Sequence, residues 1–312
     1  MTPEIKGNLS ASVAARLLNR ARQTGDDYQI LLTSYCLERF LYRLAVSDCR
    51  DRFVLKGAML LRLWSERPYR ATLDLDLLRR GDGAFDAVRD DLRAIVATRV
   101  PPDAVDFDGE RITIEAIRAE DEYAGTRATL PARCGKARLM LQIDMGLADI
   151  VWPPPESCAF PTLLDFPAPT LLAYPREAVV AEKFEAMVVL GDRNSRIKDF
   201  FDLHHLASRF TFDRATLAEA VRQTFARRHT PIPPDAPLAL TRDYWDNPSR
   251  PAQVRAFARR ARIDVPADFA DECSRLLDAF LSSVLDDLRR GRKTSGAWAP
   301  GGPWSPQSTE AR

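Results

Sequence analysis

The sequence predicts an α/β protein of two lobes, the first with a mixed β-sheet and the second mainly helical. Up to about residue 150, segments that alternate like strands follow segments with helical spacing. A proline-rich stretch over 151–175 then excludes a continuous helix or a central strand. We therefore expect lobes over 1–150 and 176–290, a crossing over 151–175, and a disordered tail over 291–312.

The composition allows a large core and gives no global charge. Of the 312 residues, 46% are apolar, which is enough for one large or two modest domains. The 45 basic and 44 acidic residues leave a formal net charge of +1, so nucleic acid could be bound only through a local basic patch. The five cysteines are scattered without a Cys-x-x-Cys pair, which argues for a reducing compartment and against zinc or a disulfide framework.

Several familiar sequence signals do not occur. The start of the chain lacks the apolar core of a signal peptide, and no run approaches the roughly 20 apolar residues of a membrane span. We therefore expect a cytoplasmic protein without membrane contact. There is no Walker phosphate loop, no Gly-x-Gly-x-x-Gly, no His-Glu-x-x-His and no nucleophile elbow, so the chemistry must rest on carboxylates, a lysine and a metal.

Two helices are predicted at the beginning of the chain. Apolar residues at helical spacing predict the first over 8–24, and Gly25 would end it. The same spacing predicts the second over about 28–47, which also carries Glu38, Arg39 and Arg43.

The stretch over 53–78 carries the strongest functional signal. An apolar run ends in Lys56-Gly57, and a short apolar segment and a polar turn lead to the alternating Thr72-Leu73-Asp74-Leu75-Asp76-Leu77. On a strand, Asp74 and Asp76 project from the same face, where two carboxylates repel each other unless they share a cation. This pattern suggests a divalent metal. Gly57 would let the backbone approach a ligand, and free amides at the start of a following helix would favour a phosphate.

A structural explanation of the same pattern stays open. An amphipathic edge strand also alternates leucine and aspartate without any chemistry. Aspartate is a poor strand former, however, and two in one short strand need a compensating reason. The preceding Lys-Gly turn favours function.

Further elements complete the first lobe. We expect a helix near 85–98 and a strand over 111–116, and a strand over 136–146 that carries Asp144 near its end. If Asp74, Asp76 and Asp144 end adjacent strands, a three-carboxylate metal cluster becomes possible. Alone, Asp144 would be an ordinary strand-end residue.

The second lobe opens with two helices joined over 191–195, and these contain the next candidate residues. Lys183 borders the apolar stripe of the first helix, and Asp199 and Asp202 lie near or inside the packing of the second. The alternatives are a surface lysine whose stem covers apolar area and a local pair between Lys198 and Asp202. Further helices are expected over 215–225, 251–263 and 269–288. The second of these contains RAFARRARID, a basic patch that we interpret as a solvated face, with an RNA-facing surface as the alternative.

With these pieces placed, the sequence resembles the AbiEii/AbiGii toxin family of nucleotidyltransferases, within the DNA polymerase β-like superfamily. The resemblance runs from Glu38 to about His229 and rests on the blocks ERFLYRL, FVLKGAMLL, YRATLDLDLL, LQIDMGLAD, FPTLLDFPAP and AEKFEAMVVLGDRNSRIKDFFDL. It implies a polymerase β-like first lobe and a toxin of a bacterial toxin–antitoxin or phage-defence pair. It further implies Mg²⁺-dependent transfer of a nucleoside monophosphate from a nucleoside triphosphate to RNA, with the tRNA 3′ end as the expected acceptor, translation as the inhibited process and a cognate antitoxin as partner.

The resemblance also implies roles for single residues. Asp74 and Asp76 match the metal-binding pair, and Asp144 matches the third carboxylate, which is expected to bind metal and activate the attacking hydroxyl. Lys183 and Asp199 are the catalytic residues expected from the second lobe. The residues implied in nucleotide binding are Lys56, Gly57, Thr72, Lys183, Arg196 and Lys198.

Two positions depart from the family pattern. Ala58 follows Gly57 where the superfamily usually has glycine or serine. One hydroxyl or backbone group that could contact the phosphates is therefore missing. Ala148 stands where relatives often have glycine, which affects the loop after Asp144. Transfer to a small molecule or a protein, and a non-catalytic module that binds RNA or protein, remain alternative hypotheses.

Overall fold

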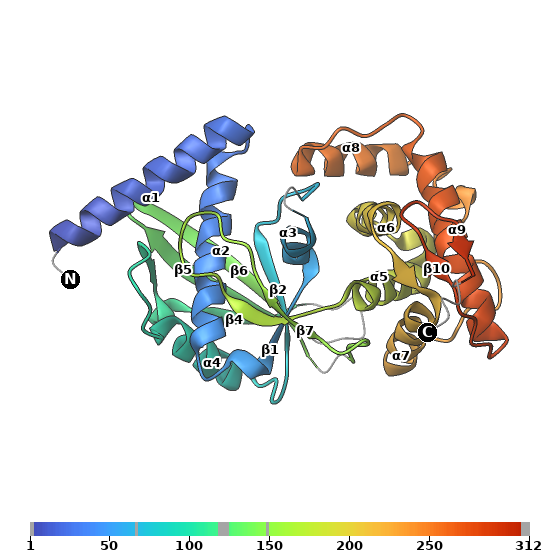
Figure 1. Ribbon diagram of the computed structural model, residues 1–312, viewed down its shortest axis with the longest axis horizontal. Helices are drawn as coiled ribbons and strands as arrows, with labels where there is room; N and C mark the ends of the chain where they lie inside the picture. The colour runs from blue at the N-terminus through green and yellow to red at the C-terminus, as the bar shows by residue number, and fades with distance from the viewer. Residues whose placement is uncertain (1–2, 66–67, 118–124, 148–149, 307–312) are drawn as a thin grey trace, which may run out of the picture. The chain divides into compact units, whose positions relative to one another are not determined.

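The computed structural model describes residues 3–65, 68–117, 125–147 and 150–306 (Figure 1). The chain divides into two compact units. The first comprises Met1–Asp149 and Pro155–Tyr174, and the second comprises Ile150–Pro154 and Pro175–Arg312.

Within the described residues, the first unit contains an eight-stranded mixed sheet. Its strands are β1 (Phe53–Lys56), β2 (Asp74–Arg79), β3 (Val105–Phe107), β4 (Thr113–Ile117), β5 (Gly125–Cys134), β6 (Ala137–Leu147), β7 (Glu156–Ala159) and β8 (Thr170–Ala173). The order along the sheet is β3-β5-β6-β2-β1-β8-β7, and β4 also pairs with β5. At the centre, β2 runs parallel to β6 and antiparallel to β1.

The helices of the first unit are α1 (Pro3–Thr24), α2 (Tyr28–Val46), α3 (Leu60–Trp64) and α4 (Phe85–Ala97). Asp27 caps α2, because its side chain accepts hydrogen bonds from the backbone amides of Gln29 and Ile30. Most of α2 is buried, including its charged residues Glu38 and Arg39. The helices and strands expected over 8–24, 28–47, 85–98, 111–116 and 136–146 all form, with ends shifted by a few residues.

Buried charges on α2 are paired with groups far away in the sequence. Arg43 donates to both carboxylate oxygens of Asp103, at 2.7 and 3.1 Å, and to the carbonyl of Val105. Glu38 accepts a hydrogen bond from the backbone amide of Leu163 at 2.7 Å. Since an unpaired buried charge is costly, these pairs fix how α2 lies against the loops around it.

The proline-rich segment differs from the simple crossing that the sequence predicts. It contributes β7 and β8 to the sheet of the first unit, and β8 lies between β1 and β7. The prolines do not interrupt β8, because Pro169 precedes it and Pro175 follows it, where a missing amide costs no ladder hydrogen bond.

The second unit is mainly helical, as the sequence predicts. Its helices are α5 (Arg176–Leu190), α6 (Ile197–Arg209), α7 (Arg214–Arg227), α8 (Arg250–Ala261) and α9 (Phe269–Arg289). Aromatic side chains fill its core. Phe201 on α6 stacks on Phe269 with ring centroids 4.0 Å apart, and Phe200 stacks on Tyr244 at 4.4 Å.

Residues 297–305 depart from the disorder expected of the tail. They form β10 (Ala297–Trp298) and β11 (Trp304–Ser305), which join β9 (Phe212–Asp213) in a small sheet. Trp298 is fully buried, its ring centroid lies 4.8 Å from that of Phe280, and its Nε1 donates to the carbonyl of Ala207 at 2.7 Å. Two tryptophans bury enough apolar area to order a segment that its glycine, proline and serine content makes resemble a flexible tail.

We predict that Asp103→Ala lowers the free energy of unfolding of the first unit by about 3–5 kcal/mol, because it leaves the buried Arg43 guanidinium unpaired. Urea unfolding followed by circular dichroism measures the change. Asp165→Ala is the matched control, since Asp165 pairs with Arg16 but is almost fully exposed, and its removal should leave the midpoint unchanged. Equal losses in both variants would contradict the assignment.

Candidate active site

The register of β2 and β6 brings the predicted carboxylates of the first unit together. Asp76 lies directly opposite Asp144, and Asp74 lies opposite Gln142. Directly opposed residues on paired strands share a face, as do residues two apart on one strand. Asp74, Asp76 and Asp144 therefore project from one face of the sheet. The apolar residues between them, Leu75, Leu77 and Ile143, are fully buried on the other face.

The pairing of the neighbouring strands extends this arrangement on both sides. Lys56 on β1 lies opposite Asp76, Arg127 on β5 lies opposite Asp144, and Glu115 on β4 lies opposite Arg127. We call the five residues Lys56, Asp76, Asp144, Arg127 and Glu115 the charged row. Its two central carboxylates are flanked by one cation on each side, which offsets the repulsion between them.

Gly57 lets the backbone pass directly against Asp76. Its φ of +71° lies in the left-handed region. A Cβ at this position would contact Oδ2 of Asp76 and lie 2.5 Å from its Cβ and Cγ, which no real side chain tolerates. The expected helix start differs from the structure, because Gly57–Met59, with Ala58 in its middle, forms a 3₁₀ turn and α3 has only five residues. The glycine therefore acts through close approach to a carboxylate.

Arg127 holds Asp144 in a two-point ion pair. Its Nε and Nη2 donate to the two carboxylate oxygens, each at 2.8 Å, and Gln142 Nε2 donates to Oδ2 at 3.2 Å. The hydrogen bond to Asp144 is the main reason that the pKa of Arg127 is raised. Sequence reasoning missed Arg127 because it missed β5. The alternation of Thr126, Ala128, Leu130, Ala132 and Cys134 with more exposed residues is the signal that could have found the strand.

Two further predicted residues lie beside the carboxylates. The hydroxyl of Thr72 accepts from the backbone amide of Asp74 at 3.3 Å and donates to its carbonyl at 3.1 Å, so it shapes the beginning of β2. The Lys56 ammonium lies 5.1 Å from the ring centroid of Tyr174, within reach of a cation–π interaction. Ala148, the departure expected to affect the loop after Asp144, lies outside the described residues.

The second unit brings together the other predicted cluster. Lys183 Nζ lies 2.7 Å from Asp199 Oδ1 and 2.7 Å from Asp202 Oδ2, and Arg196 Nε lies 2.7 Å from Asp199 Oδ2. Burial alone would raise the pKa of Asp199, but Lys183 and Arg196 outweigh it and hold the pKa below its ordinary value. Lys183 thus pairs with two carboxylates instead of covering apolar surface. Lys198 is exposed and forms no ion pair with the residues that the structure describes.

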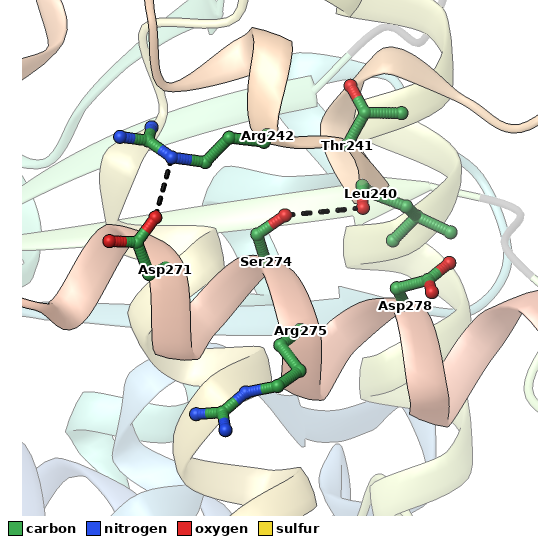
Figure 2. A pocket seen from close by; sticks show the side chains of 7 residues that line it. All are labelled: Leu240, Thr241, Arg242, Asp271, Ser274, Arg275 and Asp278. Carbon is green, nitrogen blue, oxygen red and sulfur yellow. Dashed lines mark hydrogen bonds and ion pairs between the residues drawn. The ribbon is translucent and has the colours of Figure 1, made fainter.

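The second unit also has a hollow of about 400 Å³, shown in Figure 2. Two of its lining residues form an ion pair, in which Arg242 Nε lies 2.6 Å from Asp271 Oδ1. Ser274 donates a hydrogen bond to the carbonyl of Leu240. None of the residues predicted for the site lines it. The lining residues are Leu240, Thr241, Arg242, Asp271, Ser274, Arg275 and Asp278.

The donor set of the first unit suits a hard divalent cation such as Mg²⁺, which prefers carboxylate oxygens. Asp74 and Asp76 offer such oxygens side by side on β2. Both oxygens of Asp144 already accept from Arg127. Among the described residues, no three carboxylate, imidazole or thiol side chains are grouped closely enough to hold a metal ion. The donor chemistry that fits such a cation is therefore that of the β2 pair, whereas Asp144 is engaged by Arg127.

The family model of the nucleotidyl transferase AbiEii toxin, from type IV toxin–antitoxin systems, matches residues 39–282. The chain belongs to the AbiEii family. This AbiEii protein is therefore a nucleotidyltransferase toxin of a type IV toxin–antitoxin system, with a nucleotide substrate and an antitoxin partner. The matched segment contains every residue that the sequence predicts for the site, and the resemblance inferred from the sequence is confirmed.

Two solved structures are similar to this chain, and the first of them supports the fold. The protein is similar to MenT4, a nucleotidyltransferase toxin from Mycobacterium tuberculosis H37Rv, with 21% identity, a TM-score of 0.50, and coverage of 91% of this chain and 99% of that chain. It is also similar to JHP933 from Helicobacter pylori, with 14% identity, a TM-score of 0.46, and coverage of 85% and 95%. No curated protein matches the sequence. Within the described part of the chain, no helix combines the length and apolar character needed to cross a membrane.

We predict that Gly57→Ala lowers nucleotidyl transfer by at least about tenfold, because the new methyl group displaces the carboxylate of Asp76, which the sequence predicts to act in the reaction. Transfer is measured as incorporation of α-labelled nucleotide into total RNA. Gly25→Ala is the matched control, since Gly25 has a similar φ of +75° but open space around it. Both variants should lose a similar, small amount of stability from backbone strain, of roughly 1–3 kcal/mol. Unchanged transfer in Gly57→Ala would contradict the close approach.

Proposed function

We propose that Asp74, Asp76 and Asp144 form the catalytic centre of a Mg²⁺-dependent transfer to RNA. In this reaction a nucleoside monophosphate moves from a nucleoside triphosphate to the 3′ end of tRNA, and translation in the cytoplasm is inhibited as a result. The observation that carries the proposal is the β2–β6 register, which sets Asp76 beside Asp144, with the Gly57 backbone against Asp76.

The carboxylates of the first unit have separate roles in this proposal. Asp74 and Asp76 would hold the metal and Asp144 would join them, since all three project from one face. Mg²⁺, when bound, neutralises charge on the triphosphate and lowers the pKa of a coordinated hydroxyl. Asp144 assists the acceptor hydroxyl as it loses its proton. The hydroxyl oxygen then bonds to the α-phosphorus, and the bond from that phosphorus to pyrophosphate breaks.

Basic residues would bind the phosphates. Lys56 lies next to Asp76 in the charged row, and Gly57 exposes a backbone without a side chain. From the second unit, Lys183 is the cation assigned to the leaving phosphates, and Asp199 orients it through a hydrogen bond of 2.7 Å. Arg196 and Lys198 complete the nucleotide-binding set. Thr72 acts by holding the backbone of Asp74 in place.

We predict that Asp76→Ala lowers transfer by about 10³-fold, since losing a metal ligand removes several kcal/mol of transition-state stabilisation. Purified protein is incubated with total tRNA, Mg²⁺ and each α-labelled nucleoside triphosphate separately. Asp51→Ala is the control, because Asp51 is a highly exposed carboxylate outside the row. Label in tRNA with one triphosphate identifies both the reaction and the preferred base.

Two outcomes of this assay would change the proposal. Full transfer by Asp76→Ala would refute the metal assignment. Consumption of a triphosphate without label in tRNA would refute the RNA acceptor and indicate a small molecule or a protein instead.

We predict that Arg127→Gln tightens the binding of Mn²⁺, used as a probe for Mg²⁺, by about tenfold. The substitution removes a charge-assisted pair from Asp144, of a kind worth roughly 1.5–3 kcal/mol, and frees its oxygens for the metal. Titration calorimetry measures the affinity without any turnover. Arg133→Gln is the matched control on the same strand, because Arg133 pairs with Asp106 outside the row. Unchanged Mn²⁺ affinity in Arg127→Gln would exclude Asp144 from the metal set.

A further inference from the structure

Helix α8 concentrates positive charge in a chain that is otherwise balanced. The segment RPAQVRAFARRAR over 250–262 contains five arginines and no acidic residue, whereas the whole chain has a net charge of only +1. Because the whole chain is nearly neutral, it could bind nucleic acid only through a local basic patch, and this segment is such a patch.

The inner face of α8 packs into the second unit. Phe257 is buried and its ring centroid lies 4.8 Å from that of Phe201 on α6. Arg250 is also buried, donates to the carbonyls of Asn194 and Asp192, and lies 4.0 Å over the ring of Tyr244. Arg250 is therefore a structural residue, and α8 is held in a fixed orientation.

The outer face of α8 carries the remaining charge. At about 100° per residue, Arg255 lies opposite Phe257, and Arg259 lies one turn further along the same face. Both are exposed, as is Arg260. The helix dipole explains basic residues in the last turn, such as Arg259 and Arg260, but it does not explain Arg255 one turn earlier.

These three arginines have no carboxylate partner among the residues that the structure describes. Elsewhere in the unit, Arg222 pairs with Glu219 and Arg242 pairs with Asp246 and Asp271, whereas the exposed Arg209 and Arg290 form no ion pair with the described residues. Helix α8 differs in that three exposed arginines of this kind lie within six residues, on a helix without an acidic residue.

We propose that the outer face of α8, formed by Arg255 and Arg259, binds the phosphate backbone of the RNA acceptor. The proposal deepens the proposed function and rests on it. One arginine guanidinium can bind two phosphate oxygens at once. Arg255 and Arg259 lie about 6 Å apart along the helix axis. Such contacts position an RNA without reading its bases.

The chemistry of this face favours RNA over an acidic protein. Protein interfaces depend on buried aromatic or large apolar anchors. Between its arginines the outer face of α8 offers only small residues such as Ala252 and Ala256, and no large exposed apolar side chain lies on the helix. Phosphates need only charge and hydrogen-bond donors, which this face supplies.

We predict that the double variant Arg255→Ala/Arg259→Ala binds total tRNA about tenfold more weakly at about 0.15 M salt. Filter binding of the full chain over a range of salt concentrations measures both affinity and salt dependence, without nucleoside triphosphate. The slope of log K against log salt should become shallower by about 1.5–2, because two phosphate contacts are lost. Arg255→Lys/Arg259→Lys should retain most of the slope, since it keeps both charges.

The matched control is Arg209→Ala/Arg290→Ala, which removes two exposed charges from α6 and from the C-terminal end of α9 in the same unit. It should bind tRNA like the unmodified protein. An unchanged slope and affinity in the α8 variant, or an equal loss in the control, would overturn the inference. Thermal melting of each variant verifies that it is folded.

The transfer assay separates this inference from the proposed function. In the α8 variant, KM for tRNA should rise while KM for the triphosphate stays the same. If the unmodified protein binds tRNA through α8 but labels none, the inference stands and the proposed reaction fails. If it labels tRNA and the α8 variant binds and labels equally well, only the inference fails.

Discussion

The parallel pairing of β2 with β6 is the constraint on which the site depends, because it places the like charges of Asp76 and Asp144 side by side. Such a pair is unfavourable unless neighbouring groups compensate for it. Lys56 on one side and Arg127 on the other supply the compensation, and Gly57 leaves the space that the Asp76 carboxylate occupies. The strands on either side of this pair, β1 and β5, therefore serve the site as well as the core. Cations of the chain itself thus balance the two carboxylates.

The second unit contains two different arrangements of charged side chains. Lys183 and Arg196 are held by Asp199 and Asp202, so this cluster is internally neutral and fixed in position. On α8, Arg255 and Arg259 face outward and have no carboxylate partner among the described residues, so their charge is available to a partner. The first arrangement suits a group that must be oriented for chemistry, and the second suits the binding of a polyanion.

Much of the fold could be predicted because local periodicity reports burial directly. The alternation of leucine and aspartate gave β2, and apolar spacing gave α1, α2, α4 and most helices of the second unit. The tail was misjudged because two tryptophans order a segment rich in glycine, proline and serine only through contact with Phe280. Strand β5 was missed although its burial alternates, since threonine, alanine and cysteine are weak markers of an inward face.

The sequence by itself determined which residues carry charge, most of the helices, the strands that carry the three aspartates, and the family to which the chain belongs. Only the tertiary structure decided which charges meet. Asp76 and Asp144 are 68 positions apart, and their contact depends on strand order and register, which local patterns do not encode. The same holds for Arg127, whose role exists only because β5 pairs antiparallel with β6. Periodicity gives the face on which a side chain lies, but the pairing of distant strands gives its neighbours.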